Sequence, residues 1–152
     1  MSKRQLEQFY VIGISIRTTN ENQQAMKDIP VLWNKFLSEN SAGKIPNKVD
    51  DTIYCLYTHY EKDHTKPYTT ILGCKVKHLE EIPEGMVGKT VYPAKYEIFT
   101  AKGNLMKGAV ANEWLKIWNT NIPRTYTTDF EVYGAKAQNS ENAEVDIFIG
   151  VI

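Results

Sequence analysis

The chain has 152 residues with 18 basic and 18 acidic side chains, and this length suits one domain able to bury most of its apolar surface. The balanced charge gives no net field that would attract nucleic acid or a membrane surface, so neither is an expected partner. No apolar run has the length of a membrane span or the form of a signal peptide, which predicts a cytoplasmic protein. The aromatic residues, nine Tyr, three Trp and five Phe, exceed the needs of so small a core, and some are expected to line a cavity.

The first predicted elements are a strand over residues 9–19 and a helix that follows it. The strand segment is rich in Val and Ile and partly alternating. Asn20, with Gln23 three residues later, predicts the N-terminal cap of the helix, and Pro30 is expected to kink or restart it. The apolar residues with helical spacing are Ile29, Leu32, Trp33, Phe36 and Leu37.

Two further strands complete a β-α-β-β unit, and the same order then recurs. The strands are expected at residues 52–61 and 67–76, after a polar connector. A second set follows, with a strand at 90–103, a helix after Asn104, and strands at 128–134 and 144–152. The predicted fold is therefore α+β, with duplicated β-α-β-β units in a pseudo-two-fold arrangement, an antiparallel sheet, two helices and a central ligand pocket.

Three landmarks support a duplication rather than chance matching of common residues. The pairs, separated by 81, 76 and 77 residues, are Trp33 with Trp114, Tyr57 with Tyr133, and Ile71 with Phe148. The near-constant separation predicts one domain over residues 1–152, with repeat 1 at about 8–80 and repeat 2 at about 88–152. Under this alignment Cys55 of the first repeat corresponds to Glu131 of the second.

Glu131 stands between Phe130 and Val132 in a run typical of a buried strand. A carboxylate taken into an apolar interior without a partner costs several kcal/mol or takes up a proton. Its compensation could be an ion pair from a basic residue, a strand end open to water, or a cationic or hydrogen-bond-donating ligand. The candidate basic residues are Lys95, Lys116 and Arg124.

Three tryptophans lie on the apolar stripes of the two predicted helices: Trp33, Trp114 and Trp118. Each taken alone is explained by ordinary core packing. Helices packed over the sheet would nevertheless aim the indoles toward Tyr57, Tyr133 and the glutamate. Because a cation over an aromatic ring gains about 0.5–2 kcal/mol, this combination favours a mostly apolar pocket with a single charged anchor.

Six segments carry a resemblance that spans most of the chain, although none is a strict signature alone. They are IPVLWNKF at 29–36, IYCLYTHYEKD at 53–63, YTTILGCKV at 68–76, PAKYEIFTAKG at 93–103, EWLKIW at 113–118 and DFEVY at 129–133. With the closing VDIFIGVI, their order resembles the GyrI-like effector-binding domains of multidrug-responsive regulators of the AraC and MerR types. The likeness is strongest to integron cassette-encoded effector-binding proteins.

The resemblance implies a pocket for bulky, flat, often cationic hydrophobic compounds, with a buried glutamate of the penultimate strand touching the ligand. That glutamate falls on Glu131. Tyr96 matches the family's tyrosine ahead of the second helix. The predicted ligand-binding set is Glu131, Trp33, Trp114, Tyr57, Tyr133, Trp118 and Tyr96.

The resemblance also frames the functional alternatives. Regulator relatives carry a helix-turn-helix domain, whereas this chain begins almost directly with its first strand, so no DNA-binding domain and no direct nucleic-acid contact are expected. The first hypothesis is a stand-alone effector-binding or drug-binding protein, linked to transcriptional regulation or to sequestration. The alternative is a hydrolase of electrophilic cyclopropane-containing natural products, with Glu131 as general base.

Metals, cofactors and protein partners are less well marked. Cys55 and Cys74 are interpreted as buried reduced thiols, and His59, His64 and His78 as surface or turn residues, so no metal and no organic cofactor are predicted. A third class, an interaction protein whose aromatics only fill a core, stays open. A homodimer through a sheet edge or a separate regulator protein is a possible partner.

Overall fold

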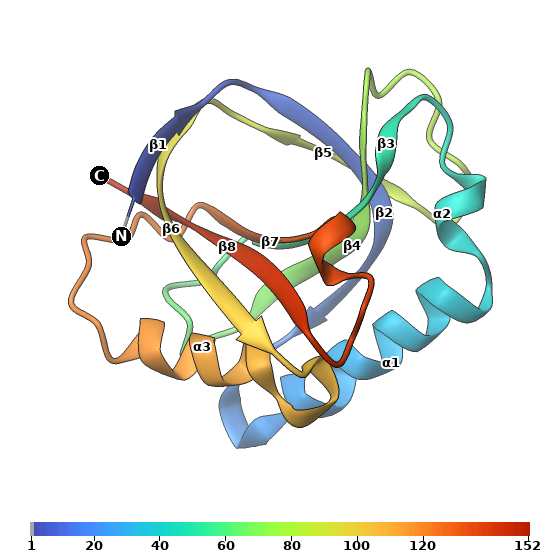
Figure 1. The fold of residues 1–152 in the computed structure, drawn as a ribbon. Helices are drawn as coiled ribbons and strands as arrows, with labels where there is room; N and C mark the ends of the chain where they lie inside the picture. Colours follow the sequence, from blue (N-terminus) through green and yellow to red (C-terminus); the bar gives the residue numbers. More distant parts are fainter. Residues whose placement is uncertain (1) are drawn as a thin grey trace.

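The computed structural model describes residues 2–152 as one curled antiparallel sheet with helices on one side. The strands are β1 (Ser2–Leu6), β2 (Phe9–Thr18), β3 (Lys48–Thr58), β4 (Tyr68–Val76), β5 (Val87–Val91), β6 (Ala94–Gly103), β7 (Thr128–Tyr133) and β8 (Ala143–Val151). The helices are α1 (Ala25–Ser38), α2 (Ser41–Lys44) and α3 (Ala109–Trp118), with 3-10 turns η1 (Glu21–Gln23), η2 (Leu105–Lys107) and η3 (Ala135–Ala137). In Figure 1 the edge strands β1 and β5 lie at the top, and α1 and α3 lie below the sheet. None of the helices in residues 2–152 is long and apolar enough to span a membrane.

The strand order is β1-β6-β8-β7-β3-β4-β2-β5, which reads as the same pattern from both ends. The units β2-α1-β3-β4 and β6-α3-β7-β8 match the two predicted β-α-β-β units, and the fold-class prediction is confirmed. Each unit also has a preceding strand that the sequence patterns did not indicate. β1 pairs with β6, and β5 pairs with β2, so each added strand extends the sheet of the opposite unit.

The strand predicted at 90–103 is in fact two strands. β5 ends at Val91 and β6 begins at Ala94, with Pro93 between them. Proline has no N–H to donate to a ladder, so it marks the corner where the chain leaves one edge of the sheet and joins another strand.

The two halves meet at the pairing of β3 with β7. Cys55 lies opposite Glu131, and on either side Tyr57 lies opposite Asp129 and Ile53 lies opposite Tyr133. A half-turn about the centre of this ladder exchanges the two flanking pairs, as expected if Cys55 and Glu131 are equivalent positions. The predicted match of Ile71 with Phe148 is two residues out of register, because the residues opposite Cys55 and Glu131 are Leu72 and Ile147.

Helix α1 begins differently from the prediction. Asn20 makes no side-chain cap; its amide donates to the His64 carbonyl (2.8 Å) and accepts from the Tyr68 hydroxyl (2.7 Å). The chain passes through a 3-10 turn before α1 starts at Ala25. Pro30 lies inside α1 without restarting it.

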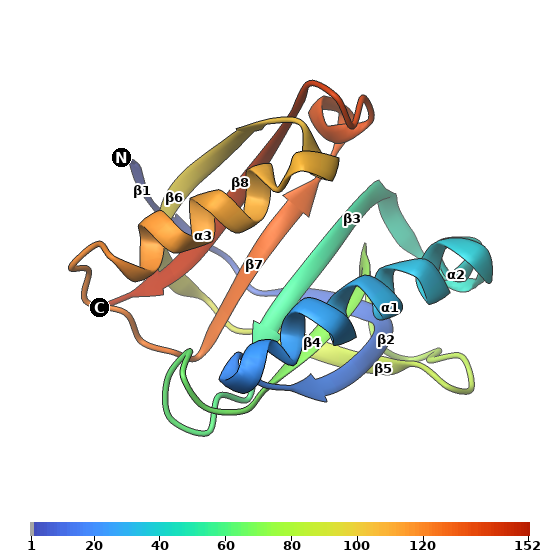
Figure 2. The same cartoon turned by 90° about the horizontal axis from the view of Figure 1, so that it is seen from below.

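The sheet carries apolar cores on both faces. Leu32 and Phe36 of α1 pack on β2 and β4, and Ile117 of α3 packs on β6 and β8. The face away from the helices holds a separate cluster that includes Phe130 and Tyr96. Seen from below in Figure 2, α1 and α3 lie side by side, with β3 and β7 running between them. This spacing of the helices leaves the centre of the sheet free to form the floor of a pocket.

Candidate ligand-binding site

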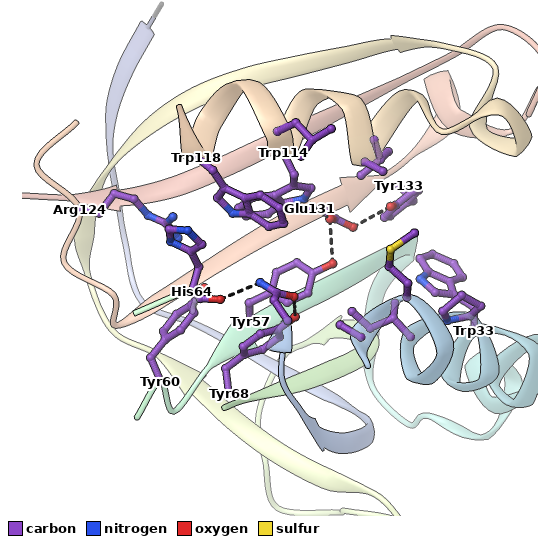
Figure 3. A pocket seen from close by; sticks show the side chains of 18 residues that line it. Trp33, Tyr57, Tyr60, His64, Tyr68, Trp114, Trp118, Arg124, Glu131 and Tyr133 are labelled. Carbon is purple, nitrogen blue, oxygen red and sulfur yellow. Dashed lines mark hydrogen bonds between the residues drawn. The ribbon is translucent and has the colours of Figure 1, made fainter. Parts of the chain in front are cut away.

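A cavity of about 340 Å³ lies between α1 and α3, over the central strands β3 and β7. Its walls are mostly aromatic and aliphatic, as the close view in Figure 3 shows. Helix α1 contributes Ala25, Met26, Ile29, Pro30 and Trp33, and α3 contributes Val110, Ala111, Trp114, Leu115 and Trp118. The strands and loops contribute Asn20, Tyr57, Tyr60, His64, Tyr68, Arg124, Glu131 and Tyr133.

Glu131 lies on the floor of this cavity and is 2% exposed. The Tyr57 hydroxyl and the Trp114 indole N–H donate to its Oε2, at 2.8 and 2.6 Å, and the Tyr133 hydroxyl donates to its Oε1 at 2.6 Å. All three donors are neutral groups. The Cys55 thiol, opposite Glu131 on β3, is a fourth neutral group that lowers the pKa of the carboxyl as a hydrogen-bond donor.

No basic side chain of residues 2–152 forms an ion pair with Glu131. Arg124 pairs with Asp129 (2.7 Å), and Lys116 lies 3.8 Å from Glu113 at the surface. Burial raises the pKa of Glu131, while the hydrogen bonds from Tyr133, Trp114 and Tyr57 act in the opposite direction. The structural alternatives raised by the sequence, an ion pair or a strand end open to water, are therefore both wrong for this residue.

The thiol opposite Glu131 stays protonated. Burial, and then the nearby charge of Glu131, raise the pKa of Cys55 well above its ordinary value. Burial likewise raises the pKa of Tyr57 and Tyr133, which keeps both hydroxyls available as donors. The floor therefore has one ionisable acceptor surrounded by neutral donors.

The aromatic rings around Glu131 contact one another edge to face. Trp33 packs against Tyr133 with ring centroids 4.7 Å apart, and Trp114 packs against Tyr57 at 5.4 Å. Trp118, 37% exposed, lies 6.4 Å from Trp114 toward the mouth of the pocket. Together these rings give a cation several aromatic faces near a carboxylate.

Six of the seven predicted ligand-binding residues line this single cavity. Tyr96 does not. It is buried on the opposite face of the sheet, edge to face with Phe130 and Phe148 at 5.2 and 6.0 Å. Tyr96 precedes Glu97 on β6, whose alternation directs it away from the helices.

The pocket has a second polar end that sequence reasoning missed. Tyr60 donates to Asp129 Oδ2 (2.6 Å), the atom that also accepts from Arg124. His64, predicted only as a surface or turn residue, is in a turn but lines the pocket, with its ring stacked on Trp118 at 5.2 Å. The alternation of β3 ends at Thr58 and His59 has a φ of 51°, so no strand pattern could have placed the residues that follow.

Comparison with known proteins agrees with this geometry. The family described as integron-associated effector-binding protein matches residues 4–151. The chain belongs to this family. The predicted resemblance to GyrI-like domains, and to integron cassette-encoded proteins in particular, is confirmed.

Three similar proteins illustrate the likeness of this chain in sequence and in fold. The integron cassette protein VCH_CASS2, from the mobile metagenome of Vibrio cholerae, is 32% identical, with a TM-score of 0.78 over 99% of this chain and 95% of that one. YobU of Bacillus subtilis (strain 168), named as a transcriptional regulator, is 26% identical over 143 residues, which cover 91% of this chain and 89% of YobU. SAV2435, solved bound to tetraphenylphosphonium, shares the fold at 21% identity, with a TM-score of 0.80 over 99% of this chain and 93% of that one.

Proposed function

We propose that this effector-binding protein captures bulky aromatic cations in the pocket between α1 and α3, with Glu131 as the charge partner. The observation that carries the proposal is a buried carboxylate held by three neutral donors, with no ion pair from residues 2–152, on the floor of an aromatic cavity. A cationic ligand would supply the charge that the fold does not.

The relatives support this choice of ligand class. SAV2435, which has the same fold, was solved bound to tetraphenylphosphonium, a cation made only of aromatic rings around a charged centre. YobU is named as a transcriptional regulator. We therefore infer that ligand capture serves regulation, through a separate regulator protein, or sequestration of the compound.

Matched ligands test the proposal. Tetraphenylphosphonium should quench tryptophan fluorescence, whereas tetraphenylborate, of the same shape but opposite charge, should not bind. Glu131→Gln should lower the affinity for tetraphenylphosphonium by at least about tenfold, or about 1.4 kcal/mol, because the amide carries no charge. The same variant should lower the affinity for triphenylphosphine oxide, a neutral aromatic compound, by less than about threefold.

Glu97→Gln is the matched control variant. Glu97 is a second buried carboxylate, 5% exposed, that does not line the pocket. The Glu97→Gln variant should leave the affinity for tetraphenylphosphonium unchanged. Equal losses for the cation and the neutral compound in Glu131→Gln would remove Glu131 as the charge anchor.

The hydrolase alternative has one favourable observation. The pKa of Glu131 is raised by burial, as suits a general base, and the carboxylate lines the cavity. Incubation with a cyclopropane-containing electrophile, followed by mass spectrometry, separates the two roles. Repeated turnover that Glu131→Gln abolishes would favour hydrolysis, and stoichiometric binding without product would reject it.

A further inference from the structure

The end of the pocket formed by Tyr60, His64 and Arg124 contains polar groups that the fold leaves without partners. Five buried side-chain atoms of residues 2–152 make no hydrogen bond, and three of them lie here: Arg124 Nε, Arg124 Nη1 and His64 Nδ1. The side chain of Arg124 is only 4% exposed, and both residues line the cavity. Unpaired nitrogens are therefore concentrated at the end of the pocket formed by His64 and Arg124.

The Arg124–Asp129 ion pair does not use up the donors of the guanidinium. Arg124 Nη2 donates to Asp129 Oδ2 at 2.7 Å, while Asp129 Oδ1 accepts from the Gly150 N–H at 2.8 Å. A guanidinium carries five N–H groups in its plane. The guanidinium carbon lies over the ring of Tyr126, 4.2 Å from the ring centre.

His64 does not add a second positive charge to this end of the pocket. Burial lowers the pKa of His64, and the neighbouring charge of Arg124 lowers it further, so its imidazole is neutral at neutral pH. The β3–β4 loop that carries His64 is tied to the pocket by the Asn20 side chain, which donates to the His64 carbonyl at 2.8 Å. Arg124 thus remains the only cation that faces the cavity among its described lining residues.

Trp114 lies beside both polar groups. Its indole N–H donates to Glu131 at 2.6 Å, and the centre of its ring lies 6.0 Å from the guanidinium carbon of Arg124. The carboxylate and the guanidinium therefore both lie next to the same aromatic side chain of the pocket wall. Figure 3 shows Arg124 and His64 on one side of the pocket and Glu131 farther along it, below Trp114.

We infer that the pocket selects zwitterionic aromatic ligands, whose cation meets Glu131 and whose carboxylate accepts from the free N–H groups of Arg124. This inference rests on the proposed function and narrows the ligand class from aromatic cations to aromatic cations that also carry an anionic group. A carboxylate is the acceptor that suits a guanidinium best, because the hydrogen bonds are charge-assisted on both sides. A purely cationic ligand would fill the same space and leave the Arg124 nitrogens unpaired.

Three related probes test the inference: N-methylquinolinium, the same cation with a carboxylate on its carbocyclic ring, and the methyl ester of that acid. The wild-type protein should bind the acid at least about tenfold more tightly than the ester. The readout is the ratio of the two dissociation constants, so that a general loss of affinity cancels. An ester that binds as tightly as the acid would overturn the inference.

The variants separate this inference from the proposed function. Arg124→Gln combined with Asp129→Asn removes both charges of the buried pair and should bring the ratio close to one. If circular dichroism shows that this double variant does not fold, the single variant Arg124→Lys is used to test the inference. It keeps a cation for Asp129 but removes Nε and Nη1, and the ratio should fall at least about threefold.

An unchanged ratio in the folded variant would overturn the role of Arg124. The unsubstituted N-methylquinolinium reports on Glu131 alone. If it binds and Glu131→Gln weakens it while the acid gains nothing over the ester, the proposed function stands and only the zwitterion inference fails. If none of the three probes binds the wild-type protein, the zwitterion inference fails, whereas the proposed function is decided separately by the tetraphenylphosphonium titration.

Discussion

Asp129 and Glu131 stand two residues apart on the same face of β7, and both are buried, yet the fold treats them differently. Asp129 receives a full countercharge from Arg124 at 2.7 Å, with further hydrogen bonds from Tyr60 and a backbone N–H. Glu131 receives only neutral donors. The first arrangement is complete within the protein, whereas the second leaves a net negative charge on the floor of a cavity.

The difference suggests a criterion for proposing which buried carboxylates are structural and which bind a ligand. Burial alone does not separate the two kinds, because both residues are nearly inaccessible. The type of partner does, because neutral donors stabilise the ionised form but do not cancel its charge. A ligand cation near Glu131 meets an uncompensated carboxylate, whereas one near Asp129 would compete with Arg124.

Removing the countercharge of Asp129 should have the largest effect. Arg124→Gln leaves a buried carboxylate without its cation, and we expect the free energy of unfolding to fall by about 3–5 kcal/mol in urea denaturation. The double variant Arg124→Gln with Asp129→Asn is the control and should recover at least half of the loss. A loss below about 1 kcal/mol in the single variant would mean that the two carboxylates are not held differently.

The charge of Glu131 should appear next, as a pH dependence of binding. Its pKa is raised above the ordinary 4.5, so the folded protein holds a proton there at pH values where the unfolded chain has lost it. Binding of tetraphenylphosphonium needs the ionised form, so its affinity should rise with pH from 4.5 through the raised pKa and then level off, by at most about tenfold per unit. Fluorescence titration should give a flat profile in Glu131→Gln; a rise of equal size there would assign the dependence to another group.

The two equivalent tryptophans provide a smaller, paired comparison. Trp114 donates to Glu131, whereas Trp33 packs on Tyr133 without contacting the carboxylate through a hydrogen bond. Trp114→Phe should therefore lower the affinity for tetraphenylphosphonium by about tenfold, because the substitution removes a hydrogen-bond donor to Glu131 and also reduces the aromatic face. Trp33→Phe keeps an aromatic ring and should lower the affinity by about threefold or less, as measured by calorimetric titration. Equal losses would show that only ring area matters.

The smallest effects should come from the tyrosines that donate to the two carboxylates. Tyr133→Phe removes a donor to Glu131 and should lower the affinity for tetraphenylphosphonium about threefold to fivefold, because ionisation becomes less favourable. Tyr60→Phe removes a donor to Asp129 and should lower the free energy of unfolding by about 1 kcal/mol. Tyr60→Phe should leave the pH profile of binding unchanged. A shift of that profile would show that Asp129 and Glu131 titrate together.

The parts of the fold that follow regular periodicity could be predicted from the sequence. Helical spacing and strand alternation gave the two β-α-β-β units and the equivalence of Cys55 with Glu131, which the central register confirms. The strands β1 and β5 were missed because each pairs with a single neighbour at a sheet edge and needs no buried apolar pattern. Tyr96 was misplaced because likeness to a family position does not decide which face of the strand a residue occupies.

The site was predictable only where its residues lie on those regular elements. Glu131, with its aromatic neighbours on α1, α3, β3 and β7, could be brought together by counting along helices and strands. Arg124 and His64 reach the pocket from connecting segments, where neither helical nor strand periodicity applies. Arg124 lies outside the named strands, at an isolated backbone bridge to Val151, and the His64 loop begins with the positive φ of His59. Such contacts depend on tertiary closure, which local sequence patterns do not encode.

The central pairing of Cys55 with Glu131 also bears on how many poses a ligand can adopt. A pocket with identical halves would offer every ligand two degenerate orientations related by a half-turn. Here the half-turn moves a bound cation from a carboxylate to a thiol one strand away, a distance of about 5 Å. If Glu131 is the charge partner as proposed, this one difference between the two halves favours one of the two orientations, in addition to the asymmetry that Arg124 and His64 introduce.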